Sequence, residues 1–140
     1  MILVVDASVA IKWFFQNGDN ETDCDLALII LESVGTGQIQ LLQPPHFIAE
    51  VAAVLAREKP GEAQDDLFDL LCVECQISQG PEIYTTAIDL SIRYRHHLFD
   101  TLYHAIALHT PGSTFITADE AYWRKVQNMG HIVRLQDFAI

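Results

Sequence analysis

The stretch Ile2-Leu3-Val4-Val5-Asp6 decides the fold class of this chain. Its four apolar residues run without a break, and two of them are valines. Such a run predicts a strand at 2–5 that is buried on both faces. Asp6 follows at once, so the sequence places a carboxylate at the end of the predicted strand.

Outward from this strand, the chain alternates predicted helices and strands, punctuated by proline and glycine. Apolar spacing predicts helices over 7–15, 24–34, 45–58, 63–72, 82–94, 98–109 and 119–128. Further strands are predicted at 73–78, 114–117 and 131–135, and 39–43 is an apolar stretch of uncertain type. Strands separated by helices predict an α/β fold, here a three-layer α/β/α sandwich around a central, mostly parallel sheet.

Length and composition describe a globular protein. The chain has 140 residues, which predicts a single domain spanning 1–140. Half of the residues are apolar and 19% are charged, as in ordinary folded domains. No apolar run reaches the roughly 18 residues that a membrane helix needs, and the N-terminus lacks the basic start of a signal peptide. We therefore expect no membrane partner. Three cysteines are an odd count, so we also expect no disulfide framework and a cytoplasmic location.

The charge balance restricts the possible partners. Eight Lys and Arg stand against nineteen Asp and Glu, which gives a net charge of −11. A chain this acidic does not attract nucleic acid or an anionic membrane through its overall field. The balance favours metal-binding chemistry, small-molecule chemistry or a basic partner.

Two acidic residues stand after predicted strands. Asp6 directly follows the strand at 2–5. Asp119 follows the strand at 114–117 after one alanine. Because the carboxyl ends of parallel strands lie along one edge, where open α/β sheets place ligands, the two carboxylates could converge. The alternative is that both are only helix N-caps, a position that aspartate favours.

Two further acidic residues lie on predicted apolar helices. Glu50 falls on the apolar stripe of the helix at 45–58. A carboxylate that is buried there needs a partner or a metal ion. The alternative is that Glu50 lies at the rim of the core and reaches water. Asp100 lies in the first turn of the helix at 98–109, where it could serve only the helix dipole or contact His104 four residues later.

Taken together, the four acidic residues predict a metal site. Carboxylates brought within a few Å of one another raise each other's pKa, and cations make such a cluster tolerable. Oxygen ligands favour Mg²⁺ or Mn²⁺, which can activate water and stabilise the leaving oxygen of a phosphodiester. The predicted reaction is metal-dependent phosphodiester hydrolysis.

Four stretches of the sequence carry a resemblance to a known family. They are Val5-Asp6-Ala7-Ser8-Val9-Ala10-Ile11-Lys12-Trp13-Phe14, Phe47-Ile48-Ala49-Glu50-Val51-Ala52-Ala53-Val54-Leu55, Phe99-Asp100-Thr101-Leu102-Tyr103-His104-Ala105-Ile106-Ala107-Leu108 and Phe115-Ile116-Thr117-Ala118-Asp119. In this order they resemble the motifs of the PIN-domain ribonucleases, specifically the VapC toxins of type II toxin–antitoxin systems. The resemblance spans nearly the whole chain.

The resemblance implies a PIN fold, dependence on Mg²⁺ or Mn²⁺, endonucleolytic cleavage of RNA, a homodimer and neutralisation by a cognate antitoxin. It implies that the acidic residues are both catalytic and metal-binding: Asp6, Glu50, Asp100 and Asp119. Ser8 and Thr117 would support them by hydrogen bonds, although Ser8 could be only a helix-turn residue and Thr117 only a strand residue.

Several other residues have competing interpretations. Lys12 could lie near the site or be a solvated lysine, and Glu120 is the one candidate for a further acid, although we expect it to point away. His104 could support the site, but a surface histidine is the favoured interpretation. Cys72 and Cys75 are interpreted as buried thiols, because no second cysteine pair completes a zinc site. Asp19, Glu21, Asp23 and Asp25 are interpreted as an exposed acidic loop.

Two other functions remain open from the sequence. One is a PIN-like module that binds a partner without catalysis, against which stands the intact set of acidic residues. The other is a metal-dependent phosphatase acting on small phosphate esters. The acidic charge also suits a basic antitoxin tail that would fill the groove of the protein.

Overall fold

The computed structural model describes residues 1–15 and 22–140 and confirms the three-layer α/β/α architecture. Five strands form one sheet in the order β3-β2-β1-β4-β5, and every neighbouring pair is parallel. The strands are β1 (Ile2–Val5), β2 (Gln40–Gln43), β3 (Cys75–Ile77), β4 (Ser113–Thr117) and β5 (Ile132–Arg134).

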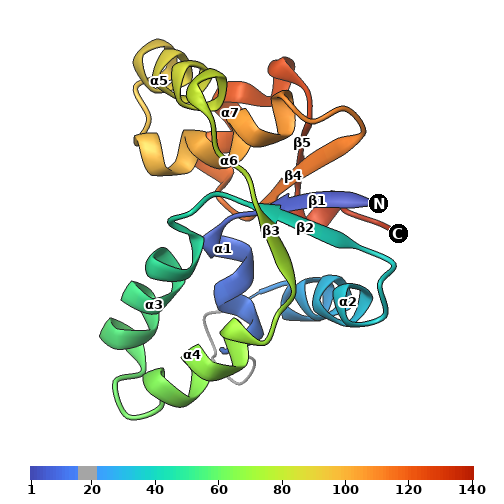
Figure 1. The fold of residues 1–140 in the computed structure, drawn as a ribbon, viewed down its shortest axis with the longest axis vertical. Helices are drawn as coiled ribbons and strands as arrows, with labels where there is room; N and C mark the ends of the chain where they lie inside the picture. The colour runs from blue at the N-terminus through green and yellow to red at the C-terminus, as the bar shows by residue number, and fades with distance from the viewer. Residues whose placement is uncertain (16–21) are drawn as a thin grey trace.

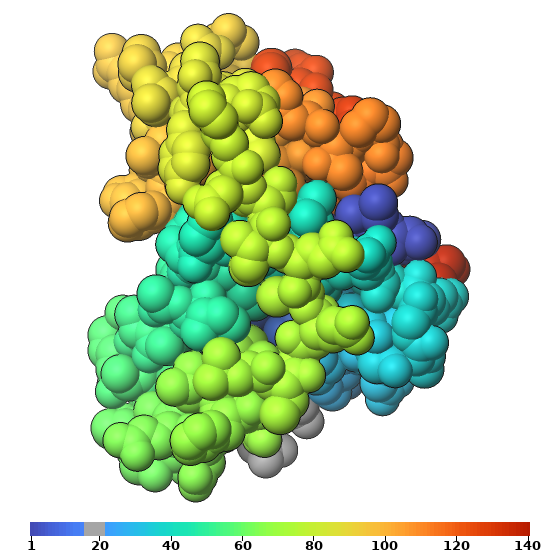
Figure 2. All heavy atoms as spheres, in the orientation of Figure 1, coloured from blue at the N-terminus to red at the C-terminus, as the bar shows by residue number. Residues whose placement is uncertain are grey.

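Helices cover both faces of this sheet. They are α1 (Ala7–Ala10), α2 (Cys24–Gly35), α3 (Phe47–Glu58), α4 (Ala63–Leu71), α5 (Pro81–Tyr94), α6 (Leu98–Leu108) and α7 (Glu120–Val126), with short 3₁₀ turns η1 (Ile11–Trp13), η2 (Gln127–Met129) and η3 (Leu135–Asp137). Figure 1 shows α5, α6 and α7 on one side of the sheet and α1 to α4 on the other. In Figure 2 the segment that contains β3 runs across the surface between these two helical layers. Among the described residues, the structure has no helix that is both long and apolar enough to cross a membrane.

The core explains why β1 and α6 are so apolar. Leu3, Val4 and Val5 of β1 are at most 1% exposed, because β1 is the central strand and has helices on both faces. Residues 101–107 of α6 are all buried, because α6 lies between the sheet and α5.

The apolar stretch of uncertain type at 39–43 is a strand, and its last residue fixes the end of β1. Leu41 of β2 pairs with Leu3 of β1. Beyond the paired backbone residues, the side chain of Gln43 makes the hydrogen bonds to β1. Its Oε1 accepts a hydrogen bond from the Val5 amide at 2.9 Å, and its Nε2 donates to the Val5 carbonyl at 2.6 Å. Gln43 is fully buried, so these two bonds hold the backbone beside Asp6 without help from water.

One predicted helix is shorter than expected. The helix predicted at 7–15 is a single α turn, α1, followed by the 3₁₀ turn η1. In the predicted acidic loop, Asp19 and Glu21 lie outside the described residues, whereas Asp23 and Asp25 are exposed at the start of α2.

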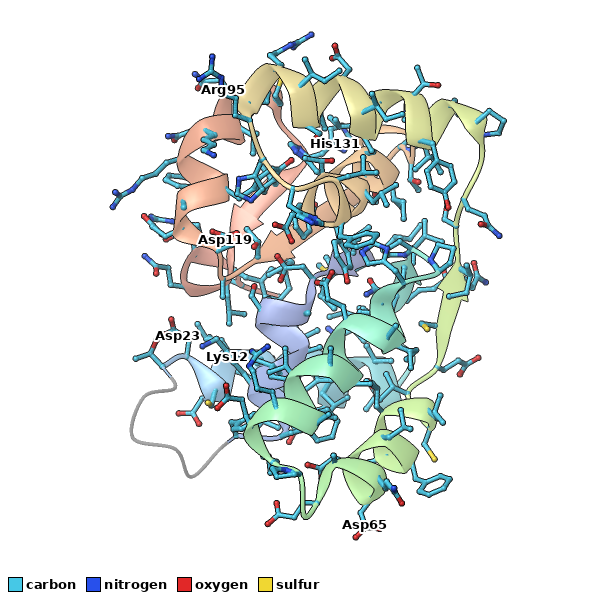
Figure 3. The ribbon with its side chains drawn as sticks, turned by 90° about the vertical axis from the view of Figure 1, so that its left-hand side faces the viewer. Lys12, Asp23, Asp65, Arg95, Asp119 and His131 are labelled. Atoms are coloured by element: carbon cyan, nitrogen blue, oxygen red, sulfur yellow. The ribbon has the colours of Figure 1, made fainter. Side chains whose placement is uncertain are left out.

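The parallel arrangement brings the carboxyl ends of β1 and β4 to the same edge of the sheet. Val5 pairs with Ile116, so the residues that follow the two strands emerge side by side. Figure 3 looks onto this edge and shows Asp119 there.

Candidate metal site

Asp6 is the most buried of the predicted acidic residues, at 6% exposed. Its Oδ1 caps α1 by accepting from the Val9 amide at 3.3 Å, and the Ser8 hydroxyl donates to the same oxygen. Its Oδ2 accepts from the Thr117 hydroxyl at 2.5 Å. The capping interpretation is therefore correct, but the cap uses only one oxygen of a carboxylate that also reaches across to β4.

Burial raises the pKa of Asp6 from 3.8 to about 7, although the Ser8 and Thr117 hydroxyls act against this rise. Near neutral pH the carboxyl group is thus poised between its neutral and ionised forms. A positive charge placed beside it would favour the ionised form.

Ser8 and Thr117 also join the ends of β1 and β4. The Ser8 hydroxyl oxygen accepts from the Ala118 amide at 3.0 Å, and the Thr117 hydroxyl oxygen accepts from the Asp119 amide at 3.0 Å. Each hydroxyl therefore donates to Asp6 and accepts from the chain that follows β4. The roles of Ser8 and Thr117 are therefore not limited to those of a helix-turn residue and a strand residue.

Asp119 and Asp100 approach the same position from different elements. Asp119 is the N-cap of α7, where its Oδ1 accepts from the Tyr122 amide at 3.1 Å. Asp100 lies in the first turn of α6. Their Oδ2 atoms lie 3.5 Å and 3.1 Å, respectively, from Nε2 of His96.

Glu50 is half-buried on α3 and has two partners. Its Oε1 lies 3.4 Å from the hydroxyl of Tyr103, which donates to it, and its Oε2 lies 3.4 Å from Nε2 of His46. The carboxylate is therefore neither enclosed in the apolar core nor simply solvated. It faces α6, which carries Asp100.

The carboxylates act on one another electrostatically. Burial and the charge of Glu50 raise the pKa of Asp100, and Asp119 adds to the rise. Asp100 in turn contributes to the raised pKa of Asp6. Burial and the neighbouring carboxylate of Glu50 raise the pKa of Tyr103, so its phenol stays protonated and can donate. The four acidic residues thus share one region of concentrated negative charge.

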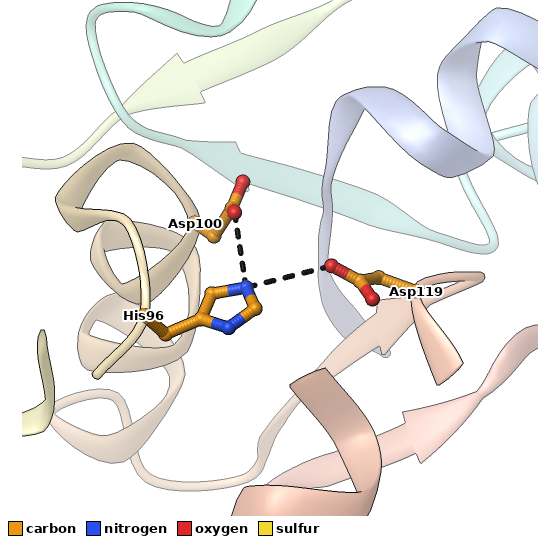
Figure 4. Close-up of side chains that lie close together, drawn as sticks. All are labelled: His96, Asp100 and Asp119. Carbon is orange, nitrogen blue, oxygen red and sulfur yellow. Dashed lines mark ion pairs between the residues drawn. The ribbon is translucent and has the colours of Figure 1, made fainter. Parts of the chain in front are cut away.

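This donor set fits a divalent cation. Carboxylates that repel one another are stabilised by a hard metal ion, and the raised pKa values of Asp6 and Asp100 show that charge is unfavourable there without one. Among the described residues, one trio of potential ligand atoms lies within 4.8 Å of one another, and it belongs to His96, Asp100 and Asp119. Figure 4 shows the imidazole of His96 between the two carboxylates.

His96 is a site residue that sequence reasoning missed, as are His46 and Tyr103, which contact Glu50. We considered the histidine four residues after Asp100, whereas the contact is made by the histidine four residues before it, in the turn between α5 and α6. The spacing of four was the available signal, but it is informative only for residues within a helix, and His96 precedes α6.

His104 and Lys12 differ from the favoured predictions. His104 is fully buried, not on the surface, and does not serve Asp100: its Nδ1 lies 2.9 Å from the Tyr122 hydroxyl and its Nε2 lies 2.9 Å from the Gly130 carbonyl. Lys12 is only 7% exposed and donates to the Thr22 carbonyl at 2.7 Å, so the solvated interpretation is wrong.

Glu120 points away from the cluster, as expected. Its carboxylate pairs with Arg134 at 3.0 Å and with Arg124 at 3.3 Å. The prediction of buried thiols fails for Cys72, which is exposed at the end of α4, whereas Cys75 on β3 is half-buried. Cys72 lies just after α4, and Cys75 lies on the edge strand β3, where less of the chain covers a side chain.

Comparison with known proteins identifies the family of this chain. The family model described as PIN domain matches residues 3–128. No curated protein sequence matches the chain. The crystal structure of PAE2754 from Pyrobaculum aerophilum is similar with a TM-score of 0.61 at 17% identity, over 97% of this chain and 93% of that one. The structure of Mycobacterium tuberculosis VapC20, described as a sarcin–ricin loop cleaving toxin, is similar with a TM-score of 0.63 at 13% identity, over 87% of this chain and 93% of that one.

Proposed function

This chain belongs to the PIN domain family, and from that premise we propose that it is a divalent-metal-dependent endoribonuclease of the VapC toxin type. The observation that carries the proposal is the position of Asp6. It is buried at the end of the central strand, held by two hydroxyls and electrostatically coupled to Asp100.

The residues proposed to hold Mg²⁺ or Mn²⁺ are Asp6, Glu50, Asp100 and Asp119, which are also the proposed catalytic residues. A bound divalent ion would supply positive charge for the attacking water and for the scissile phosphate. Ser8 and Thr117 orient Asp6 through their hydroxyls, so the carboxylate is fixed before an ion or substrate arrives. Tyr103 donates to Glu50 and fixes its orientation in the same way.

RNA is the proposed substrate. The structure of VapC20 is that of a toxin described as cleaving the sarcin–ricin loop, and an RNA phosphodiester is the substrate class that a carboxylate–metal site serves. The net charge of −11 means that the attraction for phosphate must be local, near the ion.

The proposed partners follow from the same toxin type. We propose that a cognate antitoxin neutralises the protein, that a basic tail of this antitoxin binds the acidic site, and that the chain acts as a single-domain homodimer in the cytoplasm. Charge complementarity supports the basic tail. Truncation of the tail should weaken binding and inhibition, and unchanged inhibition would contradict this part of the proposal.

The experiment that tests the activity is RNA cleavage by the Asp6→Asn variant. We expect the variant to fold and to cleave at least about a hundredfold more slowly, because its side chain carries no charge for the ion. EDTA should abolish cleavage by the unchanged protein. Asp25→Asn, an exposed acid on α2, is the matched control and should cleave normally. Full activity of Asp6→Asn, or in EDTA, would contradict the proposal, and a chromogenic phosphate ester in the same assay tests the phosphatase alternative.

A further inference from the structure

His96 places a nitrogen atom between the carboxylates of Asp100 and Asp119. We propose that Nε2 of His96 is a ligand of the bound divalent ion, together with Asp100 and Asp119, and that this site therefore selects Mn²⁺ over Mg²⁺. The inference rests on the proposed metal dependence of the enzyme, but it concerns which ion is held and by which atom.

The distances around Nε2 are those of neighbouring ligands. The nitrogen lies 3.1 Å from the Asp100 Oδ2 and 3.5 Å from the Asp119 Oδ2 (Figure 4). Adjacent ligands of an octahedral ion with bonds of about 2.1 Å lie about 3.0 Å apart. The three atoms can therefore bind one ion after small side-chain movements, without a change in the backbone.

The imidazole is held in this position. His96 has a side chain that is 13% exposed, and its ring packs on the ring of Tyr122 with centroids 4.6 Å apart. Tyr122 is itself fixed by the hydrogen bond of its hydroxyl with the buried His104. The residue before His96, Arg95, has the left-handed backbone (φ 51°) that turns the chain from α5 into α6. Position and orientation are thus determined by the fold, as is typical of a metal ligand.

Lys125 contacts the second nitrogen of His96 and has to move when an ion binds Nε2. Its ammonium group donates to Nδ1 of His96 at 3.1 Å, so without an ion the imidazole carries its proton on Nε2 and donates toward the carboxylates. Binding of an ion through Nε2 requires the proton on Nδ1 instead. The Lys125 ammonium group has a second acceptor, the Arg95 carbonyl at 3.3 Å, and can turn to it.

The ligand type gives the selectivity. Mg²⁺ prefers oxygen ligands, whereas imidazole suits transition metals, and affinity for a nitrogen-containing site rises from Mn²⁺ along the first row. One nitrogen among carboxylates therefore favours Mn²⁺ while it leaves Mg²⁺ able to bind. Four carboxylates alone would not give this preference.

Electron spin-echo spectroscopy of the Mn²⁺-loaded protein tests the ligand directly. A coordinated imidazole produces ¹⁴N couplings in the Mn²⁺ signal, and we expect them in the unchanged protein and not in His96→Leu. His97→Asn, at the neighbouring position, is the matched control and should keep the couplings. Asn at this position can still accept a hydrogen bond from the Phe99 amide at the start of α6. His46→Gln should keep them too, which excludes the histidine beside Glu50 as their source.

Calorimetry with Mn²⁺ and with Mg²⁺ tests the selectivity. In His96→Leu the affinity for Mn²⁺ should fall at least about tenfold and the affinity for Mg²⁺ less than about threefold. Circular dichroism checks that the variant is folded, and His96→Gln replaces it if it is not. Couplings that persist without His96, or equal losses for the two ions, would overturn the inference. Because these measurements need no RNA, a protein that shows the couplings but cleaves nothing would refute the proposed function alone.

Discussion

Asp6 combines three tasks that usually fall to different residues. It caps α1, accepts the hydroxyls of Ser8 and Thr117, and contributes a carboxylate to the acidic cluster. Its burial is compatible with these tasks because both oxygens are hydrogen-bonded. The cost of burying its charge appears as a pKa raised to about 7.

This pKa predicts how stability depends on pH in the metal-free protein. Between pH 4 and 7 the folded state keeps a proton on Asp6 that the unfolded state releases, so the free energy of unfolding falls as pH rises through this window. Asp6→Asn removes this contribution. We expect the unfolding free energy of the variant to gain about 3 kcal/mol relative to the unchanged protein between pH 5 and pH 8.

Urea unfolding in EDTA at the two pH values measures this difference. Any constant loss caused by the changed hydrogen bonds cancels in the comparison between pH values. Parallel pH profiles for the two proteins would show that Asp6 titrates at its ordinary pKa.

Thr117→Val tests the hydroxyl that joins Asp6 to the start of α7. Valine has the same shape but neither donates to Asp6 nor accepts from the Asp119 amide. The unfolding free energy should fall by about 1–3 kcal/mol, because the site at Thr117 is fully buried and both partners lose their hydrogen bond. Divalent-ion affinity should fall about tenfold in calorimetry. Thr114→Val on the same strand is the control, and an equal loss there would assign the effect to β4 packing.

At the scale of elements, the site depends on how the strands are held together at their ends. β1 is paired by backbone hydrogen bonds with β2 and β4, but its last residue is held on one side by the side chain of Gln43. The same strand end is followed by Asp6. The pairing of β1 and β2 thereby fixes the backbone position of Asp6.

Gln43→Leu should therefore weaken both the fold and the site. The amide and carbonyl of Val5 would be buried without partners, which costs about 2–5 kcal/mol of unfolding free energy in total. Gln40→Leu, an exposed position on the same strand, should change this free energy by less than 1 kcal/mol in the same urea experiment. Similar losses for the two variants would mean that water replaces the Gln43 amide.

At the scale of the whole molecule, most positive charge is already paired. Among the carboxylates that the structure describes, partners for ion pairs are found for Arg57, Lys59, Arg93, Arg124 and Arg134. The surface therefore has few cations to offer to a phosphate backbone.

This charge distribution predicts a weak dependence of RNA binding on salt. Each phosphate contact on a single strand contributes about 0.7 to the slope of log affinity against log salt, so binding through at most about three contacts gives a slope no steeper than about −2. Fluorescence anisotropy with a labelled RNA, the inactive Asp6→Asn variant and constant Mg²⁺ measures it. A slope of −4 or steeper would show that a basic surface, formed on dimerisation or by rearrangement, binds the RNA.

The sequence by itself determined most of the order of helices and strands, except for the type of the stretch that forms β2, together with the mostly parallel sheet and the convergence of Asp6 with the end of β4. These features follow from apolar periodicity and from the rule that parallel strands end at one edge, both of which act locally or through topology. It also identified Ser8 and Thr117, although only as possible supports.

The tertiary structure alone decided that His96, and not His104, reaches Asp100 and Asp119. His96 enters through a turn with a left-handed residue, and His104 is turned inward to Tyr122 and Gly130, because α6 is packed between the sheet and α5. The burial of Lys12 and the two hydrogen bonds of Gln43 were likewise decided by neighbours distant in the chain. Which way a side chain faces and how deeply it is buried depend on packing partners that spacing along the sequence does not specify.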